Sequence, residues 1–419
     1  MARWPAPLLA LMGSPSTNSP RTFRETGSAT WIAAAAVLVL VIAVVVKFAF
    51  FGSAPTVQRL HLLEAGHGGT AGAIAPDGSI WLWGASGFPN ATHDENDRLA
   101  AYPLKGLRGA VALSVQREFV LALKADGTVW GIGRNGHNQL GPSLPNQNVI
   151  AFEWVAIPGA TDMKAIVAEH HGAVALKRDG TVWAWGWNDW GRLGPGISAE
   201  RSAAPVQIKG LSNIVQITAG NYGNAFFAVD ASGNVWAWGQ ADAIGIPHEE
   251  RPPSGYVVEP VMFNEPKGVA RMAVNRQGMR EWLATDPSGH VTAWGSETGT
   301  QCNQELPYPH PIPAFAGAKM LAHGTIDSYA LMRDGSVWIW GLEDINGRGV
   351  CMQEPKRILP PGTAVEIAAS ATAGYLVKPD GSVWSWGHNT EAQQFAAIAQ
   401  YLVELPKLAP VTGLPRLLP

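Results

Sequence analysis

The sequence predicts an all-β fold, a seven-bladed β-propeller of four-stranded blades preceded by one N-terminal transmembrane helix. Three observations predict the propeller: a short motif recurs seven times, each copy resembles a tight hairpin, and no long helical periodicity follows the N-terminal region. The copies are spaced 46 to 56 residues apart, as in propeller repeats. Their glycines are Gly78, Gly127, Gly180, Gly233, Gly289, Gly335 and Gly381.

Each copy contains a strand, a tight turn and a second strand. In RDGTVWAWG at 178–186, Asp-Gly between apolar runs is a strong hairpin signal, and we expect both turn residues to have positive φ. After the turn, Trp183 and Trp185 alternate with Val182 and Ala184, so the two pairs should point to opposite faces of the strand. Because both pairs are apolar, we expect both faces to be covered.

Twelve of the 18 tryptophans lie in these seven copies. This repetition indicates packing between neighbouring blades, since radially packed blades bury both faces of each sheet. The turn aspartates have the same structural explanation, so we do not expect them to be catalytic. Apolar runs such as IVQITAG at 214–220 and Pro-led stretches such as APVQIKG at 204–210 supply the remaining two strands of each blade.

The repeat unit resembles the regulator of chromosome condensation repeat. The best match is AVALKRDGTVWAWGWNDWGRLG at 173–194, and NGHNQLG at 135–141 keeps the end of the motif. The resemblance covers roughly residues 55–419 and implies a seven-bladed propeller. The chain departs from the family at a position that often holds histidine, where it has Thr70, Phe119, Gly172, Ala225, Glu281, Asp327 and Ala373.

A separate element precedes the repeats. WIAAAAVLVLVIAVVVKFAFF at 31–51 is apolar except for Lys47, and as a helix it would span about 31 Å, close to the thickness of a bilayer core. We expect residues 30–51 to form a transmembrane signal anchor; a cleaved signal peptide is the alternative, although its apolar region is usually shorter. The Pro-, Ser- and Thr-rich leader 1–29 is predicted to be disordered, and the propeller to occupy 55–419.

The charges around the apolar segment predict its orientation. Arg3, Arg21 and Arg24 precede it, whereas Lys47 and Arg59 lie at or after its end. The positive-inside rule then places the N-terminus in the cytoplasm and the propeller on the far side of the membrane. We therefore expect a single-pass inner or plasma membrane protein with a periplasmic or extracellular propeller, a bacterial membrane-anchored member of the family.

No pattern in the sequence indicates catalysis or a cofactor. It lacks a nucleophile elbow, a phosphate-binding glycine loop, zinc-ligand spacing and a calcium loop, so we expect neither an enzyme nor a cofactor. In Glu169-His170-His171, neighbouring histidines at a strand end should point in opposite directions, which disfavours a metal site. Net charge is −3 and no basic stripe stands out, so we expect no nucleic-acid partner.

Three classes of function remain. A membrane-tethered module that binds another protein suits a rigid disc with variable loops and no catalytic signature. Recognition of a glycan or small ligand is the second class. Nucleotide exchange on a small GTPase is the third, and the family resemblance implies it. We favour the first class; a cytosolic location would support exchange, and saturable binding of a sugar would support the second.

One face of the propeller should carry the partner surface. In a four-stranded meander, the loop before the Ala-Leu strand and the loop after Trp-Gly share one face, while the Asp-Gly turns lie on the other. The first face collects diverse side chains, including the Trp, Tyr and Arg that dominate binding hot spots. The candidates are Phe88, Arg117, His170, Trp187, Asp189, Trp190, Tyr222, Arg276 and Asp327.

Two further expectations concern the end of the chain and the cysteines. PVTGLP at 410–415 resembles PVQIKGLS at 205–212, so the tail should supply the outer strand of the last blade and close the ring. Cys302 and Cys351 are the only cysteines and follow Trp-Gly in adjacent blades. We expect a disulfide between them, with two separate thiols as the alternative, because a bridge needs Cα atoms within about 7 Å.

Overall fold

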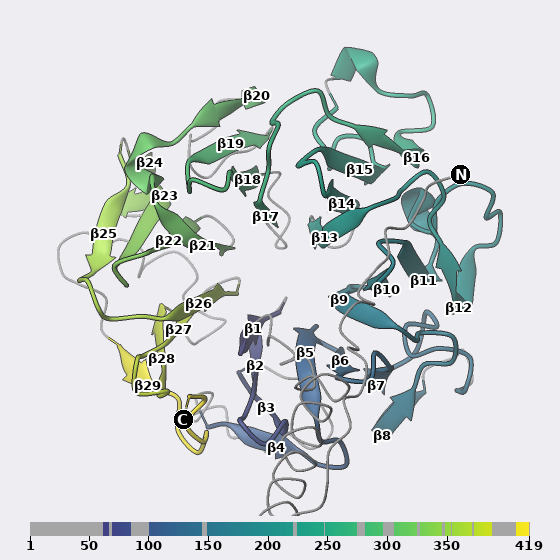
Figure 1. The fold of residues 1–419 in the computed structure, drawn as a ribbon, viewed down its shortest axis with the longest axis horizontal. Helices are drawn as coiled ribbons and strands as arrows, with labels where there is room; N and C mark the ends of the chain where they lie inside the picture. Colours follow the sequence, from purple (N-terminus) through teal and green to yellow (C-terminus); the bar gives the residue numbers. More distant parts are fainter. Residues whose placement is uncertain are drawn as a thin grey trace, which may run out of the picture. The chain divides into compact units, whose positions relative to one another are not determined.

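The computed structural model describes residues 62–66, 69–84, 100–144, 149–220, 224–246, 248–274, 281–295, 306–324, 327–345, 348–352, 354–370, 373–387 and 408–418. Residues Gln58–Pro419 form one compact unit. Within it, seven antiparallel sheets surround a central axis, each with its first strand innermost (Figure 1). The predicted seven-bladed propeller is therefore confirmed.

The first four blades are regular four-stranded meanders. Blade 1 contains β1 (Leu63–Ala65), β2 (Thr70–Ile74), β3 (Ile80–Gly84) and β4 (Tyr102–Leu104). Blade 2 contains β5 (Ala110–Val115), β6 (Phe119–Lys124), β7 (Val129–Arg134) and β8 (Ile150–Ala156). Blade 3 contains β9 (Met163–Glu169), β10 (Gly172–Lys177), β11 (Val182–Trp187), the short 3-10 helix η2 (Asp189–Gly191) and β12 (Arg201–Gln207). Blade 4 contains β13 (Ile214–Gly220), β14 (Ala225–Asp230), β15 (Val235–Gln240), η4 (His248–Glu250) and β16 (Tyr256–Met262).

The last three blades follow the same plan, with one addition in blade 6. Blade 5 contains β17 (Arg271–Val274), β18 (Glu281–Thr285), β19 (Val291–Gly295) and β20 (Leu306–Pro311), followed by η5 (Pro313–Phe315). Blade 6 contains β21 (Ala318–His323), β22 (Asp327–Met332), the long β23 (Val337–Ile345), β24 (Arg348–Cys351) and β25 (Lys356–Leu359). Blade 7 contains β26 (Glu366–Ala369), β27 (Ala373–Val377), β28 (Val383–Gly387) and β29 (Ala409–Pro410).

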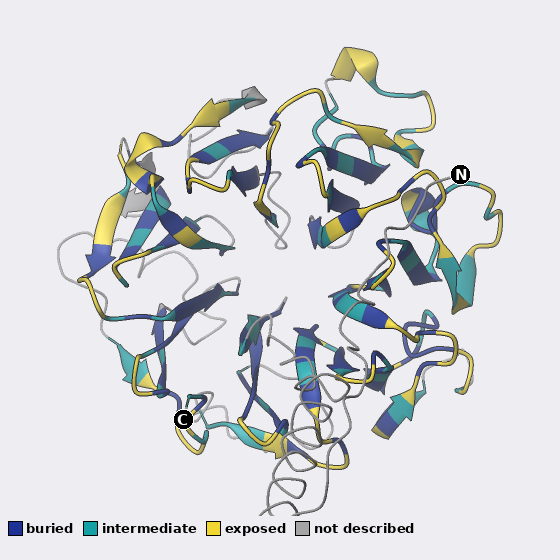
Figure 2. Ribbon diagram, in the orientation of Figure 1, coloured by how far each residue is buried: buried dark blue, intermediate teal, exposed yellow. Residues whose placement is uncertain are grey.

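The core lies between neighbouring blades, and the inner and middle strands are the most buried (Figure 2). Trp185 packs with Leu121 and Leu140 of blade 2, whereas Val182 and Ala184 belong to the cluster shared with blade 4. The predicted alternation along the strand is thus confirmed. Both faces of a blade are covered because each faces another blade.

The Asp-Gly turns differ from the expectation at their aspartates. Gly78 has φ 75°, and its amide donates to the Ala75 carbonyl at 2.9 Å, as in a type I turn followed by a left-handed glycine. Among the described residues, only Asn138, Asp162, Trp190 and Asn213 have positive φ without being glycine, so the expectation of positive φ at the turn aspartates was wrong. The physical reason is that the turn holds three residues, of which only the last must be left-handed.

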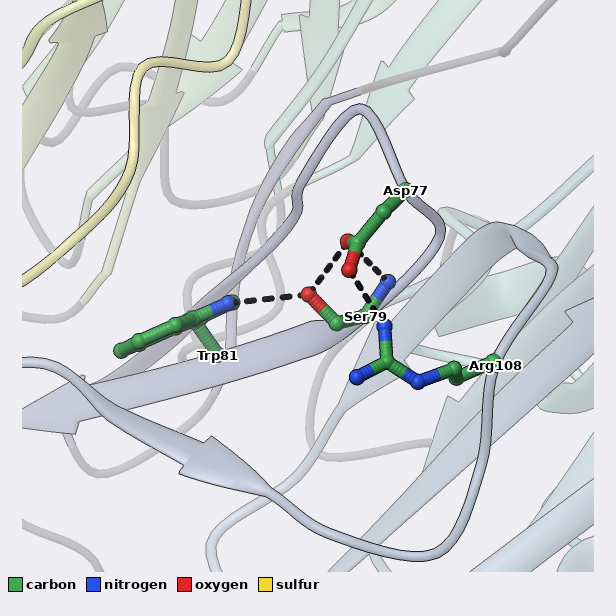
Figure 3. Close-up of polar contacts among 4 residues, drawn as sticks. All are labelled: Asp77, Ser79, Trp81 and Arg108. Carbon is green, nitrogen blue, oxygen red and sulfur yellow. Dashed lines mark hydrogen bonds and ion pairs between the residues drawn. The ribbon is translucent and has the colours of Figure 1, made fainter.

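The turn aspartate anchors a tryptophan through a hydroxyl. Asp77 Oδ1 accepts hydrogen bonds from the Ser79 amide at 3.0 Å and hydroxyl at 2.6 Å, and Ser79 Oγ accepts one from Trp81 Nε1 at 3.1 Å (Figure 3). The Ser79 bonds and the nearby Arg108 guanidinium lower the pKa of Asp77 to about 2. The same relay occurs as Asp126–Thr128–Trp130, Asp179–Thr181–Trp183, Asp334–Ser336–Trp338 and Asp380–Ser382–Trp384.

Each hairpin glycine also joins its blade to the next one. The Gly78 carbonyl accepts a hydrogen bond from the Ala110 amide, which begins blade 2. The equivalent pairs are Gly127 with Met163, Gly180 with Ile214, Gly233 with Val269, Gly289 with Gly317, Gly335 with Ala364, and Gly381 with Leu417. The seventh donor comes from the C-terminal tail, so the tail completes the series.

The ring closes where blade 7 meets blade 1. β29 pairs with β28, and the Ala101 amide donates to the Thr412 carbonyl at 2.8 Å, which confirms that the tail supplies the outer strand and meets blade 1. On the inner side, Glu366 Oε1 accepts hydrogen bonds from the amides of Leu62 at 2.8 Å and Leu63 at 3.0 Å. The buried Glu366 carboxylate therefore links blade 7 to the start of blade 1, where no stretch of chain connects the two blades directly.

Two expectations fall on residues that the structure does not describe. The leader 1–29 and the spanning segment 30–51 lie outside the described ranges, and no helix within those ranges is long and apolar enough to cross a membrane. Cys302 also lies outside them, and Cys351 ends β24. The anchor and the disulfide therefore remain predictions.

The propeller has two faces. The turn face comprises the Asp-Gly turns and the connections that lead from each outer strand to the next blade, such as 105–109 and 208–213. The loop face comprises the connections between first and second strands, such as 170–171, and between third and fourth strands, such as 188–200. This is the division that the meander topology predicts.

We predict that Glu366→Ala weakens ring closure. The substitution leaves the Leu62 and Leu63 amides without their acceptor, which should lower the free energy of unfolding by about 1–3 kcal/mol. Urea denaturation followed by tryptophan fluorescence measures the change. Glu259→Ala, on the exposed side of β16, is the matched control, and an equal shift in both variants would contradict the prediction.

Candidate functional site: a histidine and tryptophan cluster on the loop face

Asparagine side chains shape the loops that form this site. Asn188 follows β11, and its Oδ1 accepts a hydrogen bond from the Leu193 amide at 3.0 Å. In blade 2, Asn135 Oδ1 accepts one from the Leu140 amide at 2.7 Å. Each asparagine thus closes a compact loop whose leucine turns into the core, leaving the loop's middle residues on the loop face.

Four aromatic rings from blades 2 and 3 lie against one another on the loop face. His137 stacks on Trp187 with ring centroids 4.7 Å apart and an interplanar angle of 18°. His171 lies 4.1 Å from the His137 ring and 4.8 Å from Trp187, and the His170 and His171 rings stack at 4.1 Å. The cluster therefore joins two loops of blade 3 to one of blade 2.

The expected opposite orientation of His170 and His171 was wrong. β9 ends at Glu169 and β10 begins at Gly172, so the two histidines form the turn between strands. Strand alternation does not apply in a turn, and the rings come together. No group of three or more His, Cys, Asp or Glu within the described ranges is placed to hold a metal ion.

The histidines of the cluster are held in their neutral form. Burial, then the charges of His170 and His137, lowers the pKa of His171 to about 3. Burial and the Arg201 charge lower the pKa of His137, and burial lowers that of His170 despite the opposing charge of Glu118. Neutral imidazoles offer one donor and one acceptor each, which suits hydrogen bonding to a partner.

Arg192 lies buried beside this cluster. Its side chain is only 4% exposed, and Nη2 donates to Asn224 Oδ1 at 2.7 Å. Nε and Nη1 have no hydrogen-bond partner, nor do Trp187 Nε1 and His137 Nδ1. Burial lowers the pKa of Arg192 to about 10, while Asp189 and Glu169 oppose this effect. Unfilled hydrogen-bonding groups are rare in folded interiors, so their concentration here marks the cluster as a candidate binding site.

Most of the described candidates from the sequence surround this cluster. His170 and Trp187 belong to it, Asp189 lies in η2, and the charge of exposed Arg117 reaches His170. Trp190 is 40% exposed with φ 60°, a left-handed conformation that is unusual for a bulky residue.

The remaining candidates do not belong to the cluster. Asp327 begins β22 in blade 6, half-buried, and accepts a hydrogen bond from the Tyr329 hydroxyl at 3.4 Å. Phe88, Tyr222 and Arg276 lie outside the described residues. The sequence reasoning did not single out His137, His171 or Arg192 as partner residues. Aligning NGHNQLG with NDWGRLG sets His137 against Trp190 and Gln139 against Arg192, and this would have shown where the loops depart from the repeat.

The two faces differ in charge. Fourteen basic residues lie on the turn face: Lys105, Arg108, Lys124, Lys164, Lys177, Arg178, Lys209, Lys267, Arg271, Lys319, Arg333, Arg357, Lys378 and Arg416. Ten acidic residues lie there: Asp77, Asp126, Asp162, Asp179, Asp230, Glu265, Asp286, Asp334, Glu366 and Asp380. On the loop face, the described side chains include five arginines (Arg117, Arg134, Arg192, Arg201 and Arg251) and eight acidic residues (Glu118, Glu169, Asp189, Glu200, Asp242, Glu249, Glu250 and Asp327).

We predict that His171 makes stability depend on pH. An unfolded histidine binds its proton near pH 6.5, whereas folded His171 binds it near pH 3. Because the unfolded state binds more protons between these values, stability should fall as the pH decreases through this window. The chain should therefore lose more stability between pH 7 and pH 4 than His171→Gln does, measured by urea unfolding. Parallel pH profiles for the two proteins would contradict this assignment.

Comparison with known proteins gives one family match and several relatives. Residues 179–227 match the family model of the Regulator of chromosome condensation (RCC1) repeat. The E3 ubiquitin-protein ligase HERC2 of Homo sapiens is 28% identical over 268 residues, 59% of this chain and 5% of the ligase. Protein pim1 of Schizosaccharomyces pombe is 25% identical over 311 residues, 64% of this chain and 56% of pim1. The match thus spans less than two thirds of either relative.

A solved structure shares the fold. Prp20p from Saccharomyces cerevisiae, a protein with binding properties toward Gsp1p and histones, has a TM-score of 0.60 at 16% identity and covers 81% of this chain and 85% of Prp20p. The sevenfold motif, the blade topology and the family match agree with one another. The chain is a seven-bladed β-propeller, and its residues 179–227 match the Regulator of chromosome condensation (RCC1) repeat.

Proposed function

We propose that this propeller binds another protein through its loop face and performs no catalysis. The observation that carries the proposal is the cluster of His137, His170, His171, Trp187 and Arg192. There, stacked rings and unfilled hydrogen-bonding groups meet on one face. Tryptophan and arginine supply most hot-spot energy in protein interfaces.

The described groups that resemble catalytic machinery support binding over catalysis. Ser328 Oγ and His323 Nδ1 lie 3.0 Å apart, a spacing that resembles a nucleophile and base. Both side chains are buried, and burial lowers the pKa of His323 to about 4, so a substrate would not reach this pair. The Ser328 hydroxyl and His323 Nδ1 are instead hydrogen-bonding partners of each other within blade 6.

The relatives give independent support for protein binding. Prp20p has binding properties toward Gsp1p and histones, and yeast RCC1 (Prp20) has been solved bound to Kap60. A propeller of this type thus offers faces on which proteins dock. The partner of this chain is a separate question, because the match spans only part of each curated relative and identity to Prp20p is low.

The proposal includes a membrane tether. Residues 30–51 anchor the chain, the leader 1–29 lies in the cytoplasm, and the propeller lies on the periplasmic or extracellular side. The support is the apolar run and the arginines before it; the relatives named above are eukaryotic, so the bacterial setting rests on this pattern alone.

We predict that Trp187→Ala/Trp190→Ala weakens partner binding by at least about 2 kcal/mol, roughly 30-fold in Kd. Proximity labelling from the native membrane first identifies the partner, and calorimetric titration then compares the variants. Phe152→Ala is the matched control, because Phe152 is an aromatic side chain 61% exposed on β8 and takes no part in the ring contacts of the cluster. Undiminished binding by the double variant would refute the loop-face site.

Nucleotide exchange on a small GTPase is the second candidate, favoured by the shared fold with Prp20p. Release of fluorescent GDP from Gsp1p, measured with and without this chain, separates the two candidates. Under the protein-binding proposal the release rate does not change. Release accelerated tenfold or more by catalytic amounts of the chain would replace binding with exchange as the function.

A further inference from the structure

The chain enters the propeller on the turn face. Inner strands begin there, since the Ala110 and Met163 amides bond to the turn carbonyls of Gly78 and Gly127. Leu62 enters at the same level, where its amide bonds to Glu366 at the start of β26. Leu62, the first described residue, therefore lies on the turn-face side of the propeller.

The link to the apolar segment is short. Only residues 52–61 separate its end from Leu62. Ten extended residues reach at most about 35 Å. If the apolar segment spans a bilayer, the turn face is held within this distance of the headgroups.

Exposed lysines lie at equivalent positions in the connections between blades on this face. Lys105, Lys209 and Lys267 each precede a glycine with positive φ in the connection from an outer strand to the next blade. All three are exposed, and none makes a hydrogen bond or ion pair with a described residue. Their charges are therefore available to an external surface.

Further cations surround the inner rim. Lys164 donates to the Ile214 carbonyl, Arg271 to the Lys319 carbonyl, and Lys319 to the Val365 carbonyl, each across a blade boundary. A carbonyl acceptor leaves the positive charge uncompensated. Among the described residues, basic side chains outnumber acidic ones on the turn face and acidic side chains outnumber arginines on the loop face, so an anionic surface would attract the described turn face and repel the described loop face.

We propose that the turn face docks on anionic lipid headgroups in the periplasmic or extracellular leaflet of the membrane that carries the tether, which leaves the loop face pointing away from the bilayer. This inference rests on the proposed membrane tether. The tether alone does not determine which face meets the bilayer. The proposal assigns the turn face to the bilayer and attributes its docking to the charge of the headgroups.

The test uses the full chain reconstituted in vesicles. Flotation with pure phosphatidylcholine vesicles reports the tether alone. Lysine acylation, followed by mass spectrometry at Lys105, then reports docking of the turn face. We expect acylation at least about fivefold slower when the vesicles contain 30% phosphatidylglycerol, with the difference abolished in 1 M salt. Equal acylation in both lipids would overturn the proposal.

Charge variants separate this face from a general charge effect. Lys209→Gln/Lys267→Gln should lower the ratio of docked to undocked protein about 25-fold, at about fivefold per lysine, and restore acylation of Lys105. Arg134→Gln/Arg201→Gln removes the same charge from the loop face and should preserve the protection. Equal effects of the two variants would overturn the proposal.

The outcomes also distinguish the face from the tether. A chain that floats only with anionic vesicles, and loses flotation in the lysine variant, supports the turn face and refutes the tether. A chain that floats with neither refutes both. Protection of Lys105 by duplex DNA in neutral vesicles, without protection by phosphatidylglycerol, would assign the face to nucleic acid and overturn the lipid proposal.

Discussion

The propeller depends on the hydrogen bond that each hairpin glycine carbonyl accepts from an amide at the start of the next blade or, for Gly381, from an amide of the C-terminal tail. This bond fixes where each blade begins relative to its neighbour, and it requires a backbone that approaches without a side chain. A Cβ on Gly78 would lie 2.6 Å from the Gly109 amide nitrogen, and one on Gly381 would lie 2.7 Å from that of Leu418. Because blades contact only their neighbours, this junction is repeated around the ring, and the tail must supply the last copy.

The sequence predicted the structural features that every repeat shares. Alternation of Trp183 and Trp185 with Val182 and Ala184 indicated two covered faces, and the resemblance of 410–415 to 205–212 indicated closure by the tail. The turn conformation was missed because Asp-Gly fits both a two-residue and a three-residue loop. Whether the loop holds two or three residues depends on which amide donates to the Ala75 carbonyl. The residue types do not reveal this register.

The sequence predicted only those residues of the candidate site region that lie at or just after the ends of strands. His170, Trp187, Asp189 and Trp190 follow two strand ends of one blade, so topology alone brings them to one face. Their assembly with His137 depends on how the loop of blade 2 folds over blade 3, and the burial of Arg192 depends on Asn224 in blade 4. The residues of one repeat do not reveal which residues of the neighbouring blade they contact. The candidate site thus forms where the loops depart from the repeat. The repeated motif itself serves packing between blades.

Blade 6 has a feature that bears on how a partner would contact the loop face. Gly186 and Gly239 adopt positive φ and their strands end one residue later, whereas β23 continues four residues beyond Gly341 and pairs with β24. At about 3.3 Å per residue, these four residues extend β23 by roughly 13 Å beyond Gly341. Among the described blades, only blade 6 carries such a hairpin after its third strand. The hairpin interrupts the repetition of the described loop face, so a partner that contacts it would distinguish blade 6 from the blades that lack it.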